Sequence, residues 1–165
     1  LGGGSVRDVL LGHHPLVWVE HPLYLLLTAA AALATIAFAR FMDRLKRLFL
    51  FLDAIGLVVF TVLGCNVALE LELPAVVVIV AGMITGCAGG VLRDILCGEI
   101  PLLLHRELYA SVSVATGILY LAGLHLALPH ELVTFVALVL GLALRLLALR
   151  FDWNMPKFVY SKDWH

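Results

Sequence analysis

The chain has 165 residues, of which 62% are hydrophobic and 14% are charged, and its net charge is −1. A soluble domain of this size has too much surface to hide so many apolar side chains. The mean hydropathy of +1.04 therefore points to lipid as the solvent. The near-zero net charge argues against nucleic acid as a partner, because binding a phosphate backbone needs a basic surface.

Five apolar windows approach the length of about 20 residues that a helix needs to cross a bilayer. They cover residues 23–41, 50–69, 74–96, 108–128 and 132–149. Pro22, Pro74 and Pro129 stand at or just before window starts, where a helix tolerates proline. The breaks between windows are short, so consecutive helices should be antiparallel. These patterns predict an all-α, multi-pass membrane protein.

The basic residues gather on one side of the predicted bilayer. On that side alternation places Arg40, Arg44, Lys46, Arg47, Arg106, Arg150, Lys157 and Lys162. The opposite side holds Glu70, Glu72, His125, His130 and Glu131, with no Lys or Arg. The positive-inside rule then places the 40–47 loop and the C-terminus in the cytoplasm.

A motif of the form G-G-x-x-R-D-x-L-x-G-x-x-P occurs twice, at residues 3–15 and 89–101, with a constant offset of 86 residues. The offset pairs Gly3 with Gly89, Gly4 with Gly90, Arg7 with Arg93, and Asp8 with Asp94. Chance does not readily place such a motif twice in so short a chain. The sequence therefore predicts two structural repeats.

In the second copy two apolar windows precede the motif, whereas the first copy of the motif opens the chain. A complete first copy would begin roughly 35 residues before Leu1, because two spans of about 20 residues each have to open it. We expect three helices, three more and a seventh, with the first helix and most of the second missing. An odd number of spans per repeat inverts one copy relative to the other.

This layout divides the chain into four parts. Residues 1–49 form the end of the first repeat, residues 50–128 the second repeat, residues 129–150 the final helix, and residues 151–165 a cytoplasmic tail.

The glycines of the second motif have two interpretations. Gly82, Gly86 and Gly90 form a tandem G-x-x-x-G pattern, which is typical of tight helix–helix packing. Alternatively, Gly89 and Gly90 break the 74–97 helix, and the freed backbone lines a water-filled pore. The two are compatible, because a kinked pore helix still packs on its other face.

Charged residues within the predicted spans are costly and usually face a cavity or one another. The pairs Arg7–Asp8 and Arg93–Asp94 are either structural pairs at helix ends or groups that select or gate ions. Asp53 is expected in the first turn of its helix, where it would complement the helix dipole. Asn66 is expected to hydrogen-bond between helices. Both are further candidates for a pore lining.

Other chemistry is weakly indicated. Cys65, Cys87 and Cys97 form no metal-ligand pattern and are expected to be buried. His13, His14 and His21 lie near Trp18 and Glu20, in a pattern that favours an interfacial loop over a metal site. No catalytic triad, nucleotide loop or Cys/His cluster is recognisable, so we expect neither an enzyme nor a cofactor.

The doubled motif and the three-plus-three-plus-one layout resemble a bacterial membrane family with a glycine transporter domain, which is itself similar to the trimeric intracellular cation (TRIC) channels. Residues 52–60 also resemble the helix-opening motif of that family. The resemblance extends from Leu1 to about residue 149. It implies a homotrimer in the bacterial inner membrane, with a pore in each protomer lined by the helices that carry residues 2–8 and 86–94.

Three functions follow as hypotheses: passive conduction of monovalent cations such as K⁺ or Na⁺, carriage of a small solute such as glycine by alternating access, and a structural scaffold. The candidate pore residues are Gly3, Gly4, Arg7, Asp8, Asp53, Asn66, Gly86, Gly89, Gly90, Arg93 and Asp94.

The charge asymmetry predicts the outcome of a labelling experiment. With the native cysteines removed, a cysteine introduced in the 40–47 loop should resist an impermeant thiol reagent added to intact cells. A cysteine in the 70–73 turn should react. The reverse pattern would overturn the orientation.

Overall fold

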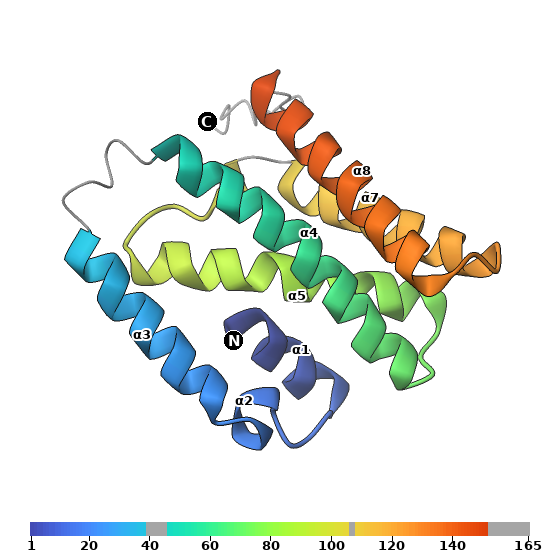
Figure 1. Cartoon of the computed structure of the whole chain (residues 1–165), viewed down its shortest axis with the longest axis horizontal. Helices are drawn as coiled ribbons and strands as arrows, with labels where there is room; N and C mark the ends of the chain where they lie inside the picture. The colour runs from blue at the N-terminus through green and yellow to red at the C-terminus, as the bar shows by residue number, and fades with distance from the viewer. Residues whose placement is uncertain (39–45, 106–107, 152–165) are drawn as a thin grey trace, which may run out of the picture.

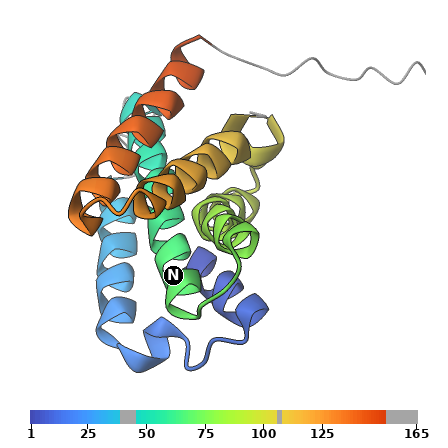
Figure 2. The same ribbon diagram turned by 90° about the vertical axis from the view of Figure 1, so that its right-hand side faces the viewer.

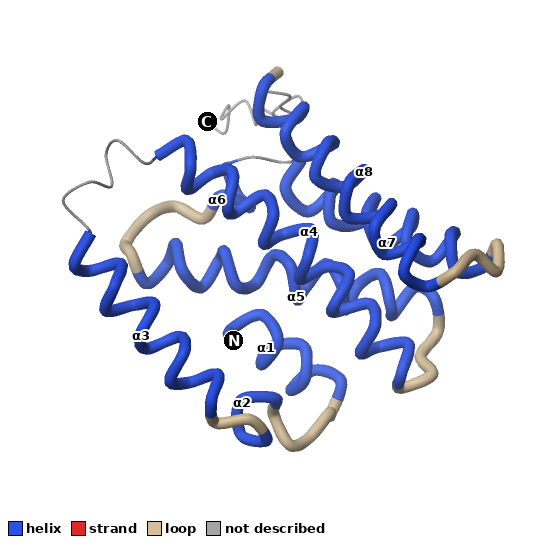
Figure 3. The backbone as a smooth tube through the Cα atoms, in the orientation of Figure 1, coloured by secondary structure: helices blue, strands red, loops and turns tan. Residues whose placement is uncertain are grey.

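The computed structural model describes residues 1–38, 46–105 and 108–151, and the regular structure in these ranges is entirely helical (Figures 1 and 3). The helices are α1 (Gly2–Leu11), α2 (Val17–Glu20), α3 (Leu23–Phe38), α4 (Lys46–Glu70), α5 (Ala75–Leu96), α6 (Leu102–His105), α7 (Leu108–His125) and α8 (His130–Arg150). Helices α4, α5, α7 and α8 are long and apolar enough to cross a bilayer. The predicted all-α membrane fold is therefore confirmed.

Two helix ends differ from the predicted windows. Helix α4 begins at Lys46, so Asp53 lies about two turns inside it, and the prediction that Asp53 occupies the first turn is wrong. Helix α7 ends at His125, and Ala127 follows with a φ of 53° before Pro129 starts the next element. For the 23–41 window, α3 is described as far as Phe38, and residues 39–41 lie outside the described ranges.

Helix α5, seen nearly end-on in Figure 2, contacts α1, α4 and α7. The α4–α5 and α7–α8 turns lie together at one end, and the start of α4 and the ends of α5 and α8 lie toward the other (Figure 1). A core between α4, α5, α7 and α8 includes Val62, Val78 and Val133. Alternating antiparallel helices therefore form the bundle, as the short connections predicted.

The two motif copies end their helices in the same way. Gly12 and Gly98 have φ values of 65° and 71°, which favour glycine. His13 N–H donates to the Asp8 carbonyl at 2.8 Å, and Glu99 N–H donates to the Asp94 carbonyl at 2.9 Å. Both are Schellman-type caps. A four-residue helix and then a longer helix follow each cap, so the sequence repeat is a structural repeat.

The copies meet at the paired glycines. Helices α1 and α5 run in opposite directions (Figure 1). A Cβ added to Gly3 would collide with the Thr85 carbonyl and lie 3.2 Å from the Gly89 nitrogen, and a Cβ added to Gly89 would lie 3.9 Å from the Gly3 nitrogen. The reciprocal approach places residues related by the offset against each other, as expected of an inverted repeat.

The predicted helix break at Gly89 and Gly90 is wrong. Helix α5 continues without interruption from Ala75 to Leu96, and α1 likewise runs unbroken through its glycines. A glycine costs a helix interior only about 1 kcal/mol, so it does not break a helix held on several sides. The neighbouring glycines instead admit α4: a Cβ on Gly82 would lie 2.8 Å from the Thr61 carbonyl, and one on Gly86 would lie 2.8 Å from the Leu57 carbonyl.

Two glycines of α4 test this packing. A Cβ on Gly64 would meet the Thr85 side chain and lie 2.9 Å from the Ala81 carbonyl, whereas one on Gly56 would meet only the Phe60 ring, at 3.9 Å. We expect Gly64→Ala to cost about 1–3 kcal/mol by overpacking. Gly56→Ala should leave stability unchanged or slightly raised, because alanine favours the helix. Thermal unfolding in mild detergent measures both, and equal midpoints would contradict the packing.

Candidate functional site

A cavity of about 390 Å³ lies between α1, α4 and α5. Its walls are formed by Leu1, Gly2, Gly3, Gly4, Phe49, Leu52, Asp53, Gly56, Phe60, Thr85, Gly86, Gly89, Gly90 and Arg93. Seven of the eleven predicted pore residues are among them; the four that are not are Arg7, Asp8, Asn66 and Asp94. Seven of the fourteen lining residues are glycines, so half of the residues in the wall bring no side chain to it.

Arg93 and Asp53 are the charged residues of this lining. The Arg93 Nη1 atom donates to Asp53 Oδ1 at 2.7 Å, and Nε donates to Asp94 Oδ1 at 2.8 Å. The guanidinium also lies 4.6 Å from the centroid of the Phe49 ring. The side chain of Arg93 is 31% exposed and that of Asp53 only 5%. A buried carboxylate is thus held by an arginine that itself reaches the cavity.

Tyr109 gives Asp53 a second donor. Its hydroxyl donates to Asp53 Oδ1 at 3.2 Å across the backbone of Gly90. Within the described residues, the other oxygen, Oδ2, is buried and has no hydrogen-bond partner. A buried, unpartnered carboxylate oxygen is costly in a protein interior. Asp53 itself is one of the residues that line the cavity.

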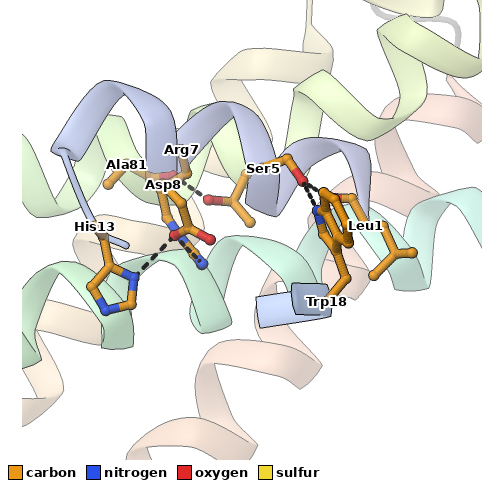
Figure 4. Close-up of polar contacts among 8 residues, drawn as sticks. Leu1, Ser5, Arg7, Asp8, His13, Trp18 and Ala81 are labelled. Carbon is orange, nitrogen blue, oxygen red and sulfur yellow. Dashed lines mark hydrogen bonds and ion pairs between the residues drawn. The ribbon is translucent and has the colours of Figure 1, made fainter. Parts of the chain in front are cut away.

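The first motif copy makes a similar but more deeply buried pair (Figure 4). Arg7 Nε and Nη2 donate to Asp8 Oδ1 at 2.8 and 2.7 Å, and the two side chains are 5% and 1% exposed. His13 Nδ1 lies 3.4 Å from the same oxygen. In the second copy, the Leu102 N–H donates to Asp94 Oδ2 at 2.8 Å. The arginine–aspartate geometry is therefore repeated, whereas the third partner differs.

The loop after α1 is tied back to that helix. Trp18 Nε1 donates to Ser5 Oγ at 3.1 Å (Figure 4), and this bond joins α2 to α1.

In the described part of the chain, no group of three or more His, Cys, Asp or Glu side chains is arranged to hold a metal ion.

Asn66 lies away from this cavity. Tyr120 donates its hydroxyl to Asn66 Oδ1, and the same hydroxyl lies 2.8 Å from His130 Nε2. The cluster links α4, α7 and α8 near the ends where the α4–α5 and α7–α8 turns lie. This geometry matches the interpretation of Asn66 as a hydrogen-bonding link between helices.

The sequence analysis missed Tyr109 and Arg145. Arg145 lies on α8, is 1% exposed, and places its guanidinium 4.5 Å from the centroid of the Tyr109 ring. An arginine inside an otherwise apolar window such as 132–149 is itself a functional signal and could have drawn attention to Arg145. The prediction of buried cysteines holds for Cys65 and Cys87 but is wrong for Cys97, which is exposed just beyond the end of α5.

A family described as glycine transporter matches residues 1–40 and 50–125. The chain belongs to this family. It is 34% identical to the UPF0126 inner membrane protein YadS of Escherichia coli K12 over 165 residues, which are 99% of this chain and 80% of that protein. It is also 34% identical to a UPF0126 membrane protein of Vibrio cholerae, over 98% of this chain and 68% of the relative.

Solved TRIC channels have the same fold. One, from work on conductance through TRIC cation channels, superposes with a TM-score of 0.87 at 34% identity. The match covers 98% of this chain and 79% of the channel's chain. The trimeric intracellular cation channel orthologue of Rhodobacter sphaeroides gives 0.86 at 35% identity, over 92% of this chain and 78% of its own. The chain is a membrane protein with a non-enzymatic channel fold, as the sequence resemblance implied.

The neighbouring glycines of the second motif should respond differently to the same substitution. A Cβ on Gly90 would lie 2.8 Å from the Tyr109 hydroxyl but 3.6 Å from the ring carbon that carries it, whereas a Cβ on Gly89 has nothing nearer than 3.9 Å. We expect Gly90→Ala to destabilise the protein by about 1–3 kcal/mol and Gly89→Ala to have little effect. In a Tyr109→Phe background the cost of Gly90→Ala should largely vanish, as a double-mutant cycle of thermal midpoints would show.

Proposed function

We propose that this protein conducts monovalent cations passively through a pathway in each protomer, and that the cavity between α1, α4 and α5 is part of that pathway. The observation that carries the proposal is the buried Asp53 Oδ2 atom, which has no protein hydrogen-bond partner within the described residues and belongs to a cavity-lining side chain. The similarity to solved TRIC cation channels supports it.

The local charges suit passage rather than tight binding. A carboxylate attracts a cation and repels an anion, but Arg93 at 2.7 Å offsets much of the negative charge. Conduction needs a site that is favourable enough to enter and weak enough to leave. Gly4 and Gly89 line the cavity and bring no side chain into it.

The proposed pathway has a direction. The basic residues place the start of α4 and the ends of α5 and α8 on the cytoplasmic side of the bacterial inner membrane. The Asp53–Arg93 pair then lies toward the cytoplasm, and the Arg7–Asp8 pair lies beyond the Gly3–Gly89 crossing on the other side. The two charged pairs thus lie on opposite sides of the crossing, and of the two it is the Asp53–Arg93 pair that lines the cavity.

We further propose that the protein assembles as a homotrimer. All side chains of residues 23–35 on α3 are exposed in the single chain, and most of them are apolar. Such a helix needs lipid or another protein surface around it. The trimeric Rhodobacter orthologue, which shares this fold, supports assembly over isolation.

A small-solute carrier is the second candidate. The family description as glycine transporter favours it, and the adjacent carboxylate and guanidinium of Asp53 and Arg93 offer opposite charges to the two ends of a zwitterion. The two functions differ in an observable way: a channel gives discrete unitary currents, whereas a carrier gives saturable counterflow of labelled glycine without them.

Purified full-length protein in planar bilayers tests the proposal. We expect unitary K⁺ or Na⁺ currents that Asp53→Asn lowers roughly fivefold or more, because a unit charge about 4 Å away is worth about 1 kcal/mol even at the dielectric constant of water. Arg93→Ala and Arg93→Lys should both change conductance, because lysine lacks the planar fork of donors. Arg7→Ala should act similarly.

Arg150→Ala is the matched control, because Arg150 is an exposed basic residue at the same end of the bundle. It should leave the currents unchanged. Counterflow without currents would favour the carrier, and neither activity would favour a structural scaffold. If the Arg93 and Arg7 variants lower only the yield of folded protein, the motif is structural.

A further inference from the structure

We propose that Arg145 of α8, which is not among the cavity-lining residues, is a positioning residue that tunes ion passage by holding Tyr109 against Asp53. This inference rests on the proposed conduction. Its basis is a continuous series of side-chain contacts that starts behind the cavity and ends in its wall.

The first contact is between Arg145 and Tyr109. The guanidinium lies 4.5 Å from the centroid of the Tyr109 ring. Both residues are buried, with Arg145 1% and Tyr109 2% exposed. A cation above an aromatic face is attracted by its quadrupole, and the attraction is stronger where water is excluded. Arg145 therefore fixes the ring against α8 and, by drawing electron density from it, makes the phenol a better hydrogen-bond donor.

The second contact carries this effect to the cavity. The Tyr109 hydroxyl donates to Asp53 Oδ1 at 3.2 Å, and Arg93 Nη1 donates to the same oxygen at 2.7 Å. Two donors on Oδ1 fix the rotation of the carboxylate. Within the described residues Oδ2 is left without a partner. The position of Tyr109 thus helps to set the orientation of the Asp53 carboxylate in the cavity wall.

Gly90 shows that this contact is built into the packing. Only a residue without a Cβ leaves room for the Tyr109 hydroxyl over α5, because an added Cβ would lie 2.8 Å from that hydroxyl and 3.7 Å from Asp53 Oδ1. Three helices are therefore shaped around the Tyr109–Asp53 bond. Arg145 contacts the Tyr109 ring from α8, at a buried position where a residue that only filled space would be apolar.

The test is a double-mutant cycle read out by the cation-to-anion permeability ratio and the unitary conductance of the full-length protein. Arg145→Met keeps an unbranched, flexible side chain and removes the guanidinium with its charge, and Arg145→Lys keeps the charge. We expect Arg145→Met to change the permeability ratio or conductance by roughly twofold or more, because twofold is about the weakest effect of a cation–aromatic contact. Arg145→Lys should recover part of the change.

Tyr109→Phe separates positioning from long-range charge. It removes the hydroxyl and keeps the ring, so an arginine that acts through the hydroxyl should have little further effect in this background. Fully additive effects of Arg145→Met and Tyr109→Phe would overturn the proposal, as would a wild-type permeability ratio and conductance in Arg145→Met. If Arg145→Met does not fold, the same cycle with Arg145→Lys decides. Absence of wild-type currents would instead remove the proposed function itself.

Discussion

Charged side chains inside an apolar bundle constrain the rest of this structure. Placing a charge at the centre of a membrane helix costs about 2.5–3.5 kcal/mol on insertion scales, so each charge has to find a partner on another helix or in the adjacent turn. Arg93 of α5 meets Asp53 of α4, and Asp53 also receives the hydroxyl of Tyr109 from α7. Arg145 adds α8 through the ring of Tyr109. One connected set of polar contacts therefore fixes the relative positions of four helices near the ends where α4 begins and α5 and α8 end.

Glycine makes these contacts geometrically possible. Membrane helices gain little from the hydrophobic effect when they associate, so close backbone approach and hydrogen bonds provide the stability. Gly82 and Gly86 let α5 reach α4, Gly3 lets α1 reach α5, and Gly90 opens the space that Tyr109 crosses. The glycines of α5 permit close packing on one face of this helix, and on another face they line the cavity. Packing and pathway are thus two consequences of one residue pattern, and a helix break is not required.

The two repeats share a backbone but differ in their surroundings. Each has an adjacent arginine–aspartate pair and a left-handed glycine cap. In the first copy the aspartate is almost wholly buried and faces His13, whereas in the second the arginine reaches the cavity and binds a carboxylate from another helix. An inverted repeat with a shared motif therefore yields two chemically different sites, because the residues and helices that surround each copy are different.

The sequence by itself determined the membrane class, the antiparallel helices, the repeat and seven residues of the cavity lining. Apolar length and a conspicuous motif are local properties, and they survive whatever packing surrounds them. It did not determine the partners. The sequence pattern predicted Asp53 in the first turn of its helix. For Asn66 it allowed both a pore lining and a hydrogen bond between helices. It gave no role to Tyr109 or Arg145, which lie in apolar windows. Only the tertiary structure brings Asp53, Arg93 and Tyr109 together across 56 residues of chain. The register and crossing angles of the helices set those distances. Both depend on how the glycine-containing faces of the helices pack together, which the order of residues in the sequence does not reveal.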